Sequence, residues 1–268
     1  MTDPSELVPL RRFAERLAIR AGAITLGYFQ SGIAVETKSD RTPVTRADRE
    51  AEAEIAREIQ ESYPDHAILG EESGYRAGSG DYTWVIDPID GTKSFIAGVP
   101  LYTVLIALIS GVFDGSQPIA SDRVLVGVVH APAARETVSA SRGSGAVWSS
   151  SAGSKPARVC APTPISDARI ATTDFASLMR RRPRLAAAIG ESGAMTRTWG
   201  DAYGYLLVAT GRIDAMIDPV MNPWDVAPLP VIIEEAGGVL TDLRGDRVVG
   251  DSTIAATPAL HADLIQYA

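Results

Sequence analysis

Apolar residues recur at helical spacing near the start of the chain. Across residues 5–30, seven of them stand three or four positions apart: Leu7, Leu10, Phe13, Leu17, Ala21, Ile24 and Tyr28. A single apolar stripe separated by polar residues predicts an amphipathic helix. Asp3 and Pro4 stand where an N-cap and a first helical residue are favoured, so we expect the helix to begin there.

A second helix is predicted over residues 47–63. Thr45 is placed to cap it, and Pro64 follows its last residue. Asp48 lies in the first turn, where a carboxylate suits the helix dipole. Residues 38–43, between the two helices, are polar and end in a proline, which predicts a loop.

Three apolar runs in the middle of the chain have the character of buried strands. Residues 82–86, 101–109 and 124–129 are short, rich in Val, Ile and Leu, and bounded by Gly, Pro or Asp. Such runs are typical of strands covered on both faces of a sheet. Residues 67–69 form a shorter apolar run that fits a further strand.

The second half mixes strands and helices again. Strands are predicted at 169–173, 213–217 and 239–241, and helices at 178–189, 202–209, 226–236 and 260–267. Pro230 lies inside the third of these helices and predicts a kink there. A Gly- and Ser-rich segment at 141–155 predicts a hairpin or surface loop, and we take it as the boundary between subdomains 1–140 and 141–268. The fold class is α/β, and the absence of a fixed-period repeat argues against solenoids and propellers.

Composition narrows the class of protein. Hydrophobic residues make up 46% of the 268 residues, which is typical of a globular chain. The formal net charge of −8 argues against sequence-independent binding to nucleic acid. The chain begins without the apolar core of a secretory signal, and its apolar runs are far shorter than the roughly 18 residues of a membrane span. We therefore expect a cytoplasmic protein with no nucleic-acid or membrane partner.

Cysteine is represented by Cys160 alone. One cysteine excludes an internal disulfide and any multi-cysteine metal site. Its apolar neighbours Val159 and Ala161 favour a small buried side chain over a nucleophile.

The most informative stretch is WVIDPIDGTK at residues 84–93. A buried strand delivers Asp87 and Asp90 at its C-terminal end, where open α/β sheets bind ligands. Gly91 and Thr92 then open a short helix whose free N–H groups suit a phosphate oxygen. Two carboxylates this close repel each other unless a cation lies between them, and all-oxygen ligands select Mg²⁺ or Mn²⁺. The alternative, a turn capped by Asp and ended by Gly, does not explain the whole set.

Other acidic residues are candidates for the same cation. Glu71 lies in GEES at residues 70–73, and Asp225 follows Trp224 at the start of a predicted helix. Adjacent glutamates more often form a solvated face, and Asp225 has equal claim to be a helix cap. Asp48 is expected mainly as a partner of its helix dipole.

Several phosphatase chemistries are disfavoured. An aspartyl nucleophile requires two Asp separated by one residue, whereas two residues separate Asp87 from Asp90. Cys160 is not in a phosphate-cradling loop, and the three histidines are scattered. Direct attack by a metal-activated water is what remains.

Three separated motifs resemble those of the inositol monophosphatase superfamily, a group of lithium-sensitive, magnesium-dependent phosphatases. They are GEES at 70–73, DPIDGT at 87–92, and WDVA at 224–227 followed by EEAGG at 234–238. The resemblance covers nearly the whole chain. It implies an α-β-α-β-α layered fold, a homodimer and two or three Mg²⁺ ions, with Mn²⁺ as a substitute.

The resemblance also implies the roles of individual residues. Glu71, Asp87, the Ile89 carbonyl and Thr92 resemble the ligands of a first metal, and Asp87, Asp90 and Asp225 those of a second. A third, weaker ion would lie near Glu71, with Asp48 reaching it through water. Glu71 and Thr92 would orient the attacking water, and Asp90 and Asp225 would flank the leaving oxygen. Gly91 and Thr92 would contact the phosphate.

Substrate choice is predicted from the region between Arg197 and Asp225. Its segments WGDAYGY (199–205) and IDPVMNP (217–223) look like the histidinol-phosphatase branch. Histidinol phosphate carries a cationic amine, so extra carboxylates at Asp201 and Asp218 favour it over neutral inositol. Arg197, Asp201 and Asp218 are therefore candidate substrate contacts, although Asp201 also fits a helix cap and Asp218 a strand end.

The sequence thus predicts a Mg²⁺-dependent phosphate-monoester hydrolase, with histidinol phosphate as the first substrate. Hydrolysis of inositol monophosphate or a related sugar phosphate is the alternative. A third hypothesis is a non-catalytic scaffold that keeps a structural cation. It is disfavoured because the sequence contains every expected metal ligand, and a scaffold would not need all of them.

Overall fold

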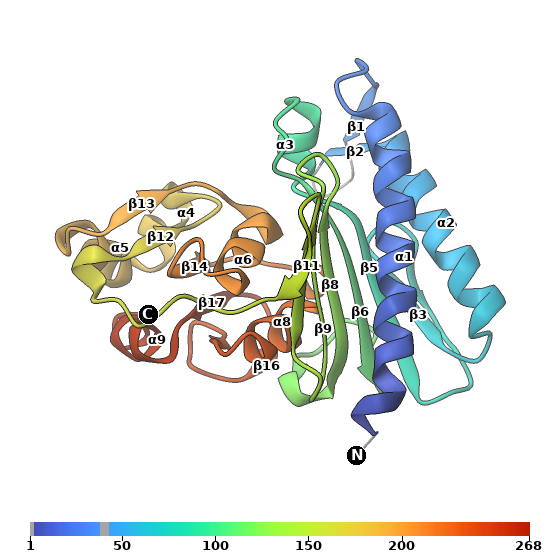
Figure 1. The fold of residues 1–268 in the computed structure, drawn as a ribbon. Coiled ribbons are helices and arrows are strands. Elements are labelled where there is room, and N and C mark those ends of the chain that lie inside the picture. The colour runs from blue at the N-terminus through green and yellow to red at the C-terminus, as the bar shows by residue number, and fades with distance from the viewer. Residues whose placement is uncertain (1–2, 38–42) are drawn as a thin grey trace.

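The computed structural model describes residues 3–37 and 43–268 (Figure 1). The loop predicted at 38–43 lies outside the described residues except for Pro43. Among the described residues, no helix has the length and apolar character needed to cross a bilayer.

A large twisted sheet forms one half of the molecule (Figure 1). In spatial order its strands are β11 (Gly153–Pro156), β10 (Ala146–Ser150), β9 (Glu136–Ser141), β8 (Val124–Ala131), β6 (Thr103–Ser110), β5 (Tyr82–Asp90), β3 (Ala67–Gly70) and β4 (Gly74–Arg76). Strands β3 and β5 are parallel, and the other neighbours are antiparallel. Strands β5, β6 and β8 are buried nearly throughout, as their apolar composition predicts.

Two helices cover the outer face of this sheet. They are α1 (Pro4–Tyr28), capped by Asp3, and α2 (Arg46–Ser62), capped by Thr45, so both predicted helices are confirmed. The α1 stripe, including Leu17, and the α2 side chains of Ile55 and Ile59 pack in one cluster with Trp84 of β5. This apolar contact fixes the helices against the sheet.

A second sheet of five strands forms the other half. Its spatial order is β13 (Met195–Arg197), β12 (Arg169–Ala171), β14 (Ala215–Asp218), β17 (Thr253–Ala256) and β15 (Val239–Thr241). Two ribbons lie apart from the sheets, pairing β1 (Val35–Thr37) with β2 (Pro43–Thr45) and β16 (Val248–Val249) with β7 (Ile119–Ala120). Short 3-10 turns occur at Ser121–Arg123 and Ile165–Asp167.

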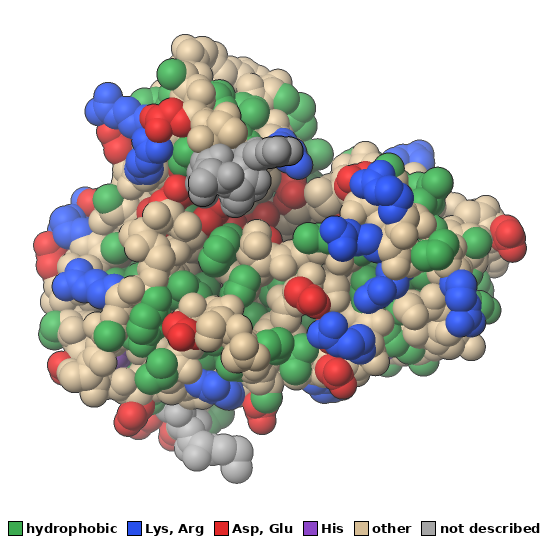
Figure 2. Space-filling view, turned by 180° about the vertical axis from the view of Figure 1, so that it is seen from behind, with side chains coloured by type: hydrophobic (Ala, Val, Ile, Leu, Met, Phe, Trp, Pro, Cys, Tyr) green, Lys and Arg blue, Asp and Glu red, His purple; other side chains and the backbone are tan. Residues whose placement is uncertain are grey.

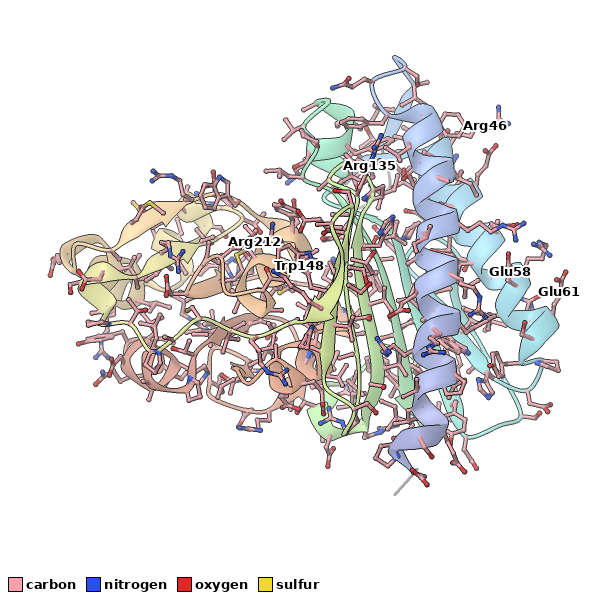
Figure 3. The ribbon with its side chains drawn as sticks, viewed as in Figure 1. Arg46, Glu58, Glu61, Arg135, Trp148 and Arg212 are labelled. Carbon is pink, nitrogen blue, oxygen red and sulfur yellow. The ribbon has the colours of Figure 1, made fainter. Side chains whose placement is uncertain are left out.

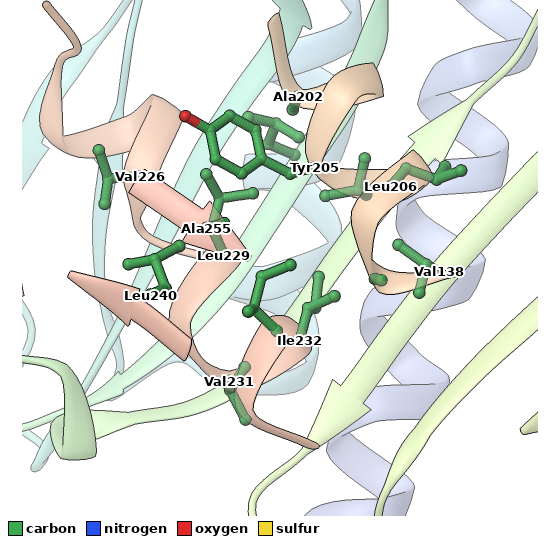
Figure 4. Packing of buried hydrophobic residues seen from close by; sticks show 14 of the residues in the cluster. Val138, Ala202, Tyr205, Leu206, Val226, Leu229, Val231, Ile232, Leu240 and Ala255 are labelled. Atoms are coloured by element: carbon green, nitrogen blue, oxygen red, sulfur yellow. The ribbon is translucent and has the colours of Figure 1, made fainter. Parts of the chain in front are cut away.

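Helices α6 (Asp201–Ala209) and α8 (Leu229–Glu235) lie between the two sheets. Figure 4 shows Leu206 and Ile232 of these helices between Val138 of β9 and Leu240 of β15. Helices α4 (Phe175–Arg181), α5 (Pro183–Glu191) and α9 (Pro258–Ile265) cover the far side of the second sheet. The α-β-α-β-α layering that the resemblance implied is therefore confirmed.

Two of the predicted helices differ from their expected course. The helix predicted at 178–189 breaks at Arg182, because the following Pro183 disfavours a helical conformation at that residue. The helix predicted at 226–236 is observed as α8, which begins at Leu229, and a separate short helix, α7 (Pro223–Val226), precedes it. Pro230 lies in the first turn of α8, where a missing N–H costs little, so the kink predicted at Pro230 is wrong.

The Gly- and Ser-rich segment folds as the hairpin of β10 and β11, which confirms one of its two predicted forms. This hairpin continues the large sheet to Pro156, and the second sheet begins at Arg169. The division into subdomains 1–140 and 141–268 stays a prediction.

Gly127 of β8 allows helix α8 to approach the sheet closely. A Cβ at this position would lie 2.2 Å from the carbonyl oxygen of Pro228 and 2.9 Å from Val231 Cγ1. Both neighbours belong to the packed layer between the sheets, so neither can move away without disturbing that core.

We expect Gly127→Ala to lower the free energy of unfolding by about 1–3 kcal/mol, as overpacking in a dense core does. Denaturant unfolding followed by circular dichroism measures the change. Gly27→Ala in α1 is the matched control, because a Cβ there meets nothing within 4 Å. Equal stability of the two variants would contradict the close-packing argument.

Candidate metal centre

Strand β5 delivers two carboxylates to one place. In a regular strand, residues three positions apart point to opposite faces. The pairing of β5 with β6 shifts register between Asp87 and Asp90, and this irregularity turns both side chains to the same side. Asp87 is 2% exposed and Asp90 is 8% exposed, so both are buried.

Helix α7 brings in a third carboxylate from a distant part of the chain. Asp225 Oδ2 accepts hydrogen bonds from the Asn222 backbone N–H at 2.7 Å and from Asn222 Nδ2 at 3.3 Å. Asp225 is therefore the N3 residue of a capping box whose N-cap is Asn222, and it also takes part in the cluster. One oxygen from each of Asp87, Asp90 and Asp225 lies within 4.8 Å of the others.

The turn after β5 contributes Gly91 and Thr92 to the site. Gly91 has a φ of 84°, a left-handed conformation that favours glycine, and it stands before α3 (Thr92–Ile96). The short helix expected after Gly91 is thus present. The Thr92 hydroxyl donates to the Ile89 carbonyl at 3.1 Å, which places two predicted oxygen ligands side by side.

These groups line a cavity of about 350 Å³ between the two halves of the molecule. Figure 2 shows acidic side chains gathered in this hollow. The described lining residues are Pro43, Glu71, Asp87, Ile89, Asp90, Gly91, Thr92, Lys93, Ser94, Leu101, Thr173, Thr198, Gly200, Asp201, Asn222 and Asp225. The structure thus brings together Glu71, Asp87 and Asp225 as the sequence predicted.

Asp90 also connects the two halves. Its Oδ2 accepts from the Thr103 hydroxyl at 2.9 Å and from the Ala202 backbone N–H at 2.6 Å. Thr103 belongs to the large sheet and Ala202 to the first turn of α6. One oxygen of Asp90 is therefore committed to the fold, which leaves the other for a ligand.

Electrostatics at the cluster are unfavourable in the absence of a cation. Burial, followed by the charges of Glu71, Asp90 and Asp225, holds the pKa of Asp87 well above its ordinary value. Burial, with the charges of Asp201 and Asp225, does the same to the pKa of Asp90. Burial raises the pKa of Asp225 to about 7.

This donor set fits hard divalent cations. The ligand atoms are carboxylate, hydroxyl and carbonyl oxygens, which suit Mg²⁺ or Mn²⁺ rather than softer metals. Among the described lining residues, Lys93 is the single cation. A bound divalent ion would relieve the repulsion that raises the pKa values of the aspartates.

Asp201 lines the cavity at the start of α6. It adopts a φ of 54°, and its N–H donates to the Thr173 hydroxyl at 2.7 Å. Its carboxylate lies next to Gly91, where a Cβ would approach Asp201 Oδ2 to 2.8 Å. Burial, then the charge of Asp218, raises the pKa of Asp201 to about 6, and Lys93 acts in the opposite direction.

Three predicted site residues do not line this cavity. Asp218 is 3% exposed and accepts from the Thr173 N–H at 2.9 Å and from the Tyr205 hydroxyl at 3.1 Å. Arg197 is exposed in β13, with its guanidinium carbon 5.9 Å from the centre of the Trp199 ring. That Arg197 and Asp218 contact substrate stays a prediction.

Asp48 is the third residue outside the cavity lining. It is buried in the first turn of α2, where its Oδ2 accepts from the Thr45 N–H at 2.8 Å and from the Thr45 hydroxyl at 2.6 Å. Asp48 is therefore the N3 residue of a capping box whose N-cap is Thr45, in the first turn where the sequence predicted a partner of the helix dipole. Its proposed link to a third ion stays a prediction.

Cys160 takes no part in the site. Its side chain is half-buried, and its thiol donates to Asp214 Oδ1 at 2.9 Å. Burial, with the hydrogen bond to Asp214, raises its pKa to about 11, which is the opposite of what a thiolate nucleophile needs.

Three supporting residues were not predicted from the sequence: Glu52, Thr103 and Thr173. Thr103 and Thr173 occur in ordinary strand and loop contexts, so no pattern singles them out. Glu52 did carry a signal. It stands four residues after Asp48 and three before Ile55, on the buried face of α2, where an unpaired carboxylate is costly. Glu52 is 3% exposed.

Comparison with known proteins agrees with this geometry. A model of the inositol monophosphatase family matches residues 6–268. The chain belongs to the inositol monophosphatase family. The family consists of metal-dependent phosphatases, so the clustered aspartates occupy a fitting context.

Individual relatives within the inositol monophosphatase family include two histidinol-phosphatases. That of Chlorobaculum parvum is 38% identical over 97% of this chain and 96% of its own length. That of Mycobacterium tuberculosis is 37% identical over 93% and 94%. Among solved structures, the IMPase of Thermotoga maritima superimposes with a TM-score of 0.80 at 28% identity, covering 96% of this chain and 95% of that one.

The raised pKa values predict how stability depends on pH without a divalent cation. The pKa of Asp225 is about 7 in the folded chain against an ordinary value of 3.8, so the folded state binds more protons between these limits. The contribution of Asp225 to stability is therefore full below pH 3.8 and is lost as the pH rises towards 7.

Thermal unfolding in EDTA across this window, compared between wild type and Asp225→Asn, isolates this contribution. The wild type should lose more stability with rising pH than the variant, and Mg²⁺ should raise the Tm of the wild type most near pH 7. Parallel pH profiles for the two proteins would contradict the assignment.

Proposed function

We propose that this phosphatase requires Mg²⁺, with Mn²⁺ as a substitute, and that its preferred substrate is histidinol phosphate. The observation that carries the proposal is the convergence of Asp87, Asp90 and Asp225 in a cavity that also holds Asp201. Asp87, Asp90 and Asp225 would hold the cation, and Asp201 adds a further acidic group to the same cavity.

Glu71, Asp87, Asp90 and Asp225 would hold the cations, together with the Ile89 carbonyl and the Thr92 hydroxyl. Bound divalent cations would supply charge stabilisation for phosphate oxygens and a lower pKa for water. The protein residues supply the remaining positioning. Glu71 and Thr92 both line the cavity, and in this proposal they orient a water by hydrogen bonding.

The part of the cavity lined by Gly91 and Asp201 is suited to a cationic leaving group. Asp201 reaches the cavity from α6, and Asp218 adds negative charge behind it. At neutral pH a carboxylate with a pKa of about 6 is mostly ionised, and a nearby ammonium group would hold it so. A neutral polyol offers Asp201 only hydroxyl donors, which form weaker hydrogen bonds than charged donors do.

Similarity to two histidinol-phosphatases supports the same choice. Inositol monophosphate or a related sugar phosphate is the second candidate substrate. The matching family model is named for inositol monophosphatase, and the similar structure from Thermotoga maritima is named an IMPase. Initial rates on histidinol phosphate and inositol 1-phosphate at equal concentration, with and without Mg²⁺, separate the two. A clear preference for inositol 1-phosphate would overturn the first choice.

Asp201→Asn tests the origin of that preference. Asparagine tolerates the left-handed backbone at this position, so the substitution removes charge with little strain. We expect kcat/KM for histidinol phosphate to fall on the order of tenfold, since charged hydrogen bonds contribute about 1.5–3 kcal/mol. The matched control is p-nitrophenyl phosphate, which has no cation. Equal losses on both substrates would exclude a role for Asp201 in recognising charge.

Asp90→Asn tests the cation site itself. The variant keeps an oxygen for the Thr103 and Ala202 hydrogen bonds but loses the negative charge. We expect turnover to fall on the order of 100-fold or more while the apo protein remains folded. Phosphate release and circular dichroism are the two measurements. Turnover near the wild-type rate would show that Asp90 holds no essential cation.

A further inference from the structure

The carboxylate of Glu52 in α2 holds the turn that carries Glu71 through two hydrogen bonds from backbone N–H groups, and we call this pair of bonds the clamp. Its Oε2 accepts from the Glu72 backbone N–H at 2.9 Å, and its Oε1 accepts from the Ser73 N–H at 2.8 Å. Glu52 does not line the cavity and cannot touch a substrate there. It acts on the two residues that immediately follow Glu71.

The approach of this carboxylate depends on Gly70. A Cβ on Gly70 would lie 2.4 Å from Glu52 Oε1 and 2.6 Å from its carboxyl carbon. Gly70 has no unusual φ, so its lack of a side chain serves this contact rather than a turn. The GEES motif thus begins with the residue that admits the clamp.

The turn is also held from its other side. The Glu71 N–H donates to the Ile86 carbonyl of β5 at 3.1 Å, one residue before Asp87. Three consecutive backbone N–H groups, from Glu71 to Ser73, are therefore fixed by β5 and Glu52 together. This arrangement sets Glu71 relative to Asp87.

A carboxylate is an expensive choice at position 52. It is 3% exposed, and it adds a negative charge next to Glu72, whose own charge acts on Asp48. A glutamine would avoid that charge, but it offers only one acceptor oxygen and cannot accept both N–H bonds in the same way. Charge-assisted bonds to two amides compensate for burial of the carboxylate.

We propose that Glu52 is a positioning residue, which preorganises Glu71 as a cation ligand by fixing the two peptide N–H groups that follow it. The inference rests on the proposed function, because Glu71 must be a ligand for its position to matter. Without the clamp, part of the free energy of cation binding would be spent on ordering the turn.

The test is Glu52→Gln in the full-length protein, with Mn²⁺ alone as the probe. Titration calorimetry should give a Kd for Mn²⁺ that is about 10–100-fold higher than in the wild type, the usual range for loss of an outer-shell partner. In phosphate-release assays, the Mg²⁺ concentration for half-maximal rate should rise in parallel. The kcat at saturating Mg²⁺ should stay within a few-fold of wild type, because the reacting groups are unchanged.

Glu61→Gln is the matched control. It makes the same change in charge on the same helix, but Glu61 is exposed and pairs with Arg57 at 2.7 Å, away from the cavity (Figure 3). The control should bind Mn²⁺ as the wild type does. An Mn²⁺ Kd for Glu52→Gln equal to that of Glu61→Gln would overturn the inference.

Glu52→Asp guards against the possibility that Glu52→Gln does not fold. Aspartate keeps the negative charge, but its side chain is shorter by one methylene group. If Glu52→Gln does not fold, Glu52→Asp takes its place, and an unchanged Mn²⁺ Kd in a folded Glu52→Asp variant overturns the inference. Failure of the proposed function is distinguishable, because then the wild type itself would bind no Mn²⁺ or release no phosphate.

Discussion

Mutual repulsion among buried carboxylates is the constraint on which the rest of this structure depends. The charges of Asp87, Asp90 and Asp225 oppose their convergence, so contacts with the rest of the fold must help to hold each one. In every case one oxygen is committed to the fold. Asp87 Oδ1 accepts from the Ile89 N–H at 3.0 Å, and Asp90 and Asp225 accept from Ala202 and Asn222. Asp87 also shares side-chain hydrogen bonds with Glu71 and with Asp225 inside the cluster.

The hydrogen bonds of Asp90 also connect the two halves of the molecule at the site. Asp90 follows the large sheet, yet its oxygen anchors the first turn of α6 in the layer between the sheets. The cavity lies at this connection, so its width is tied to the packing of α6 and α8 against β8 and β9. Gly127 belongs to the same argument, because its missing side chain allows the middle layer to lie close to the sheet.

Local patterns were sufficient to predict much of the fold and the acidic residues that converge at the cavity. The stripe of α1, the caps of both early helices and the apolar runs of β5, β6 and β8 are decided by neighbours in sequence. The motifs that contain Glu71, Asp87 and Asp225 are likewise short. The break at Arg182 was missed because helical periodicity continues across it, although the following proline marked it.

Supporting contacts could not be predicted because they join segments far apart in the chain. Thr103 and Ala202 meet at Asp90 only after both halves have folded. Glu52 reaches the Glu71 turn across 20 residues, and only its place on a buried helix face hinted at a role. Such contacts are set by tertiary packing, which sequence spacing does not encode.

Asp218 does not line the cavity, but its charge acts on Asp201, which does. It is buried beneath the cavity, and its Oδ1 accepts from the N–H of Thr173, whose hydroxyl accepts from the N–H of Asp201. Its charge therefore reaches the cavity through Asp201, whose pKa it helps to raise to about 6. A carboxylate with a raised pKa gains more from an adjacent ammonium group than one that is already stably ionised. Under the proposed preference for histidinol phosphate, Asp201 would contact the cationic leaving group and Asp218 would act on it through the pKa of Asp201.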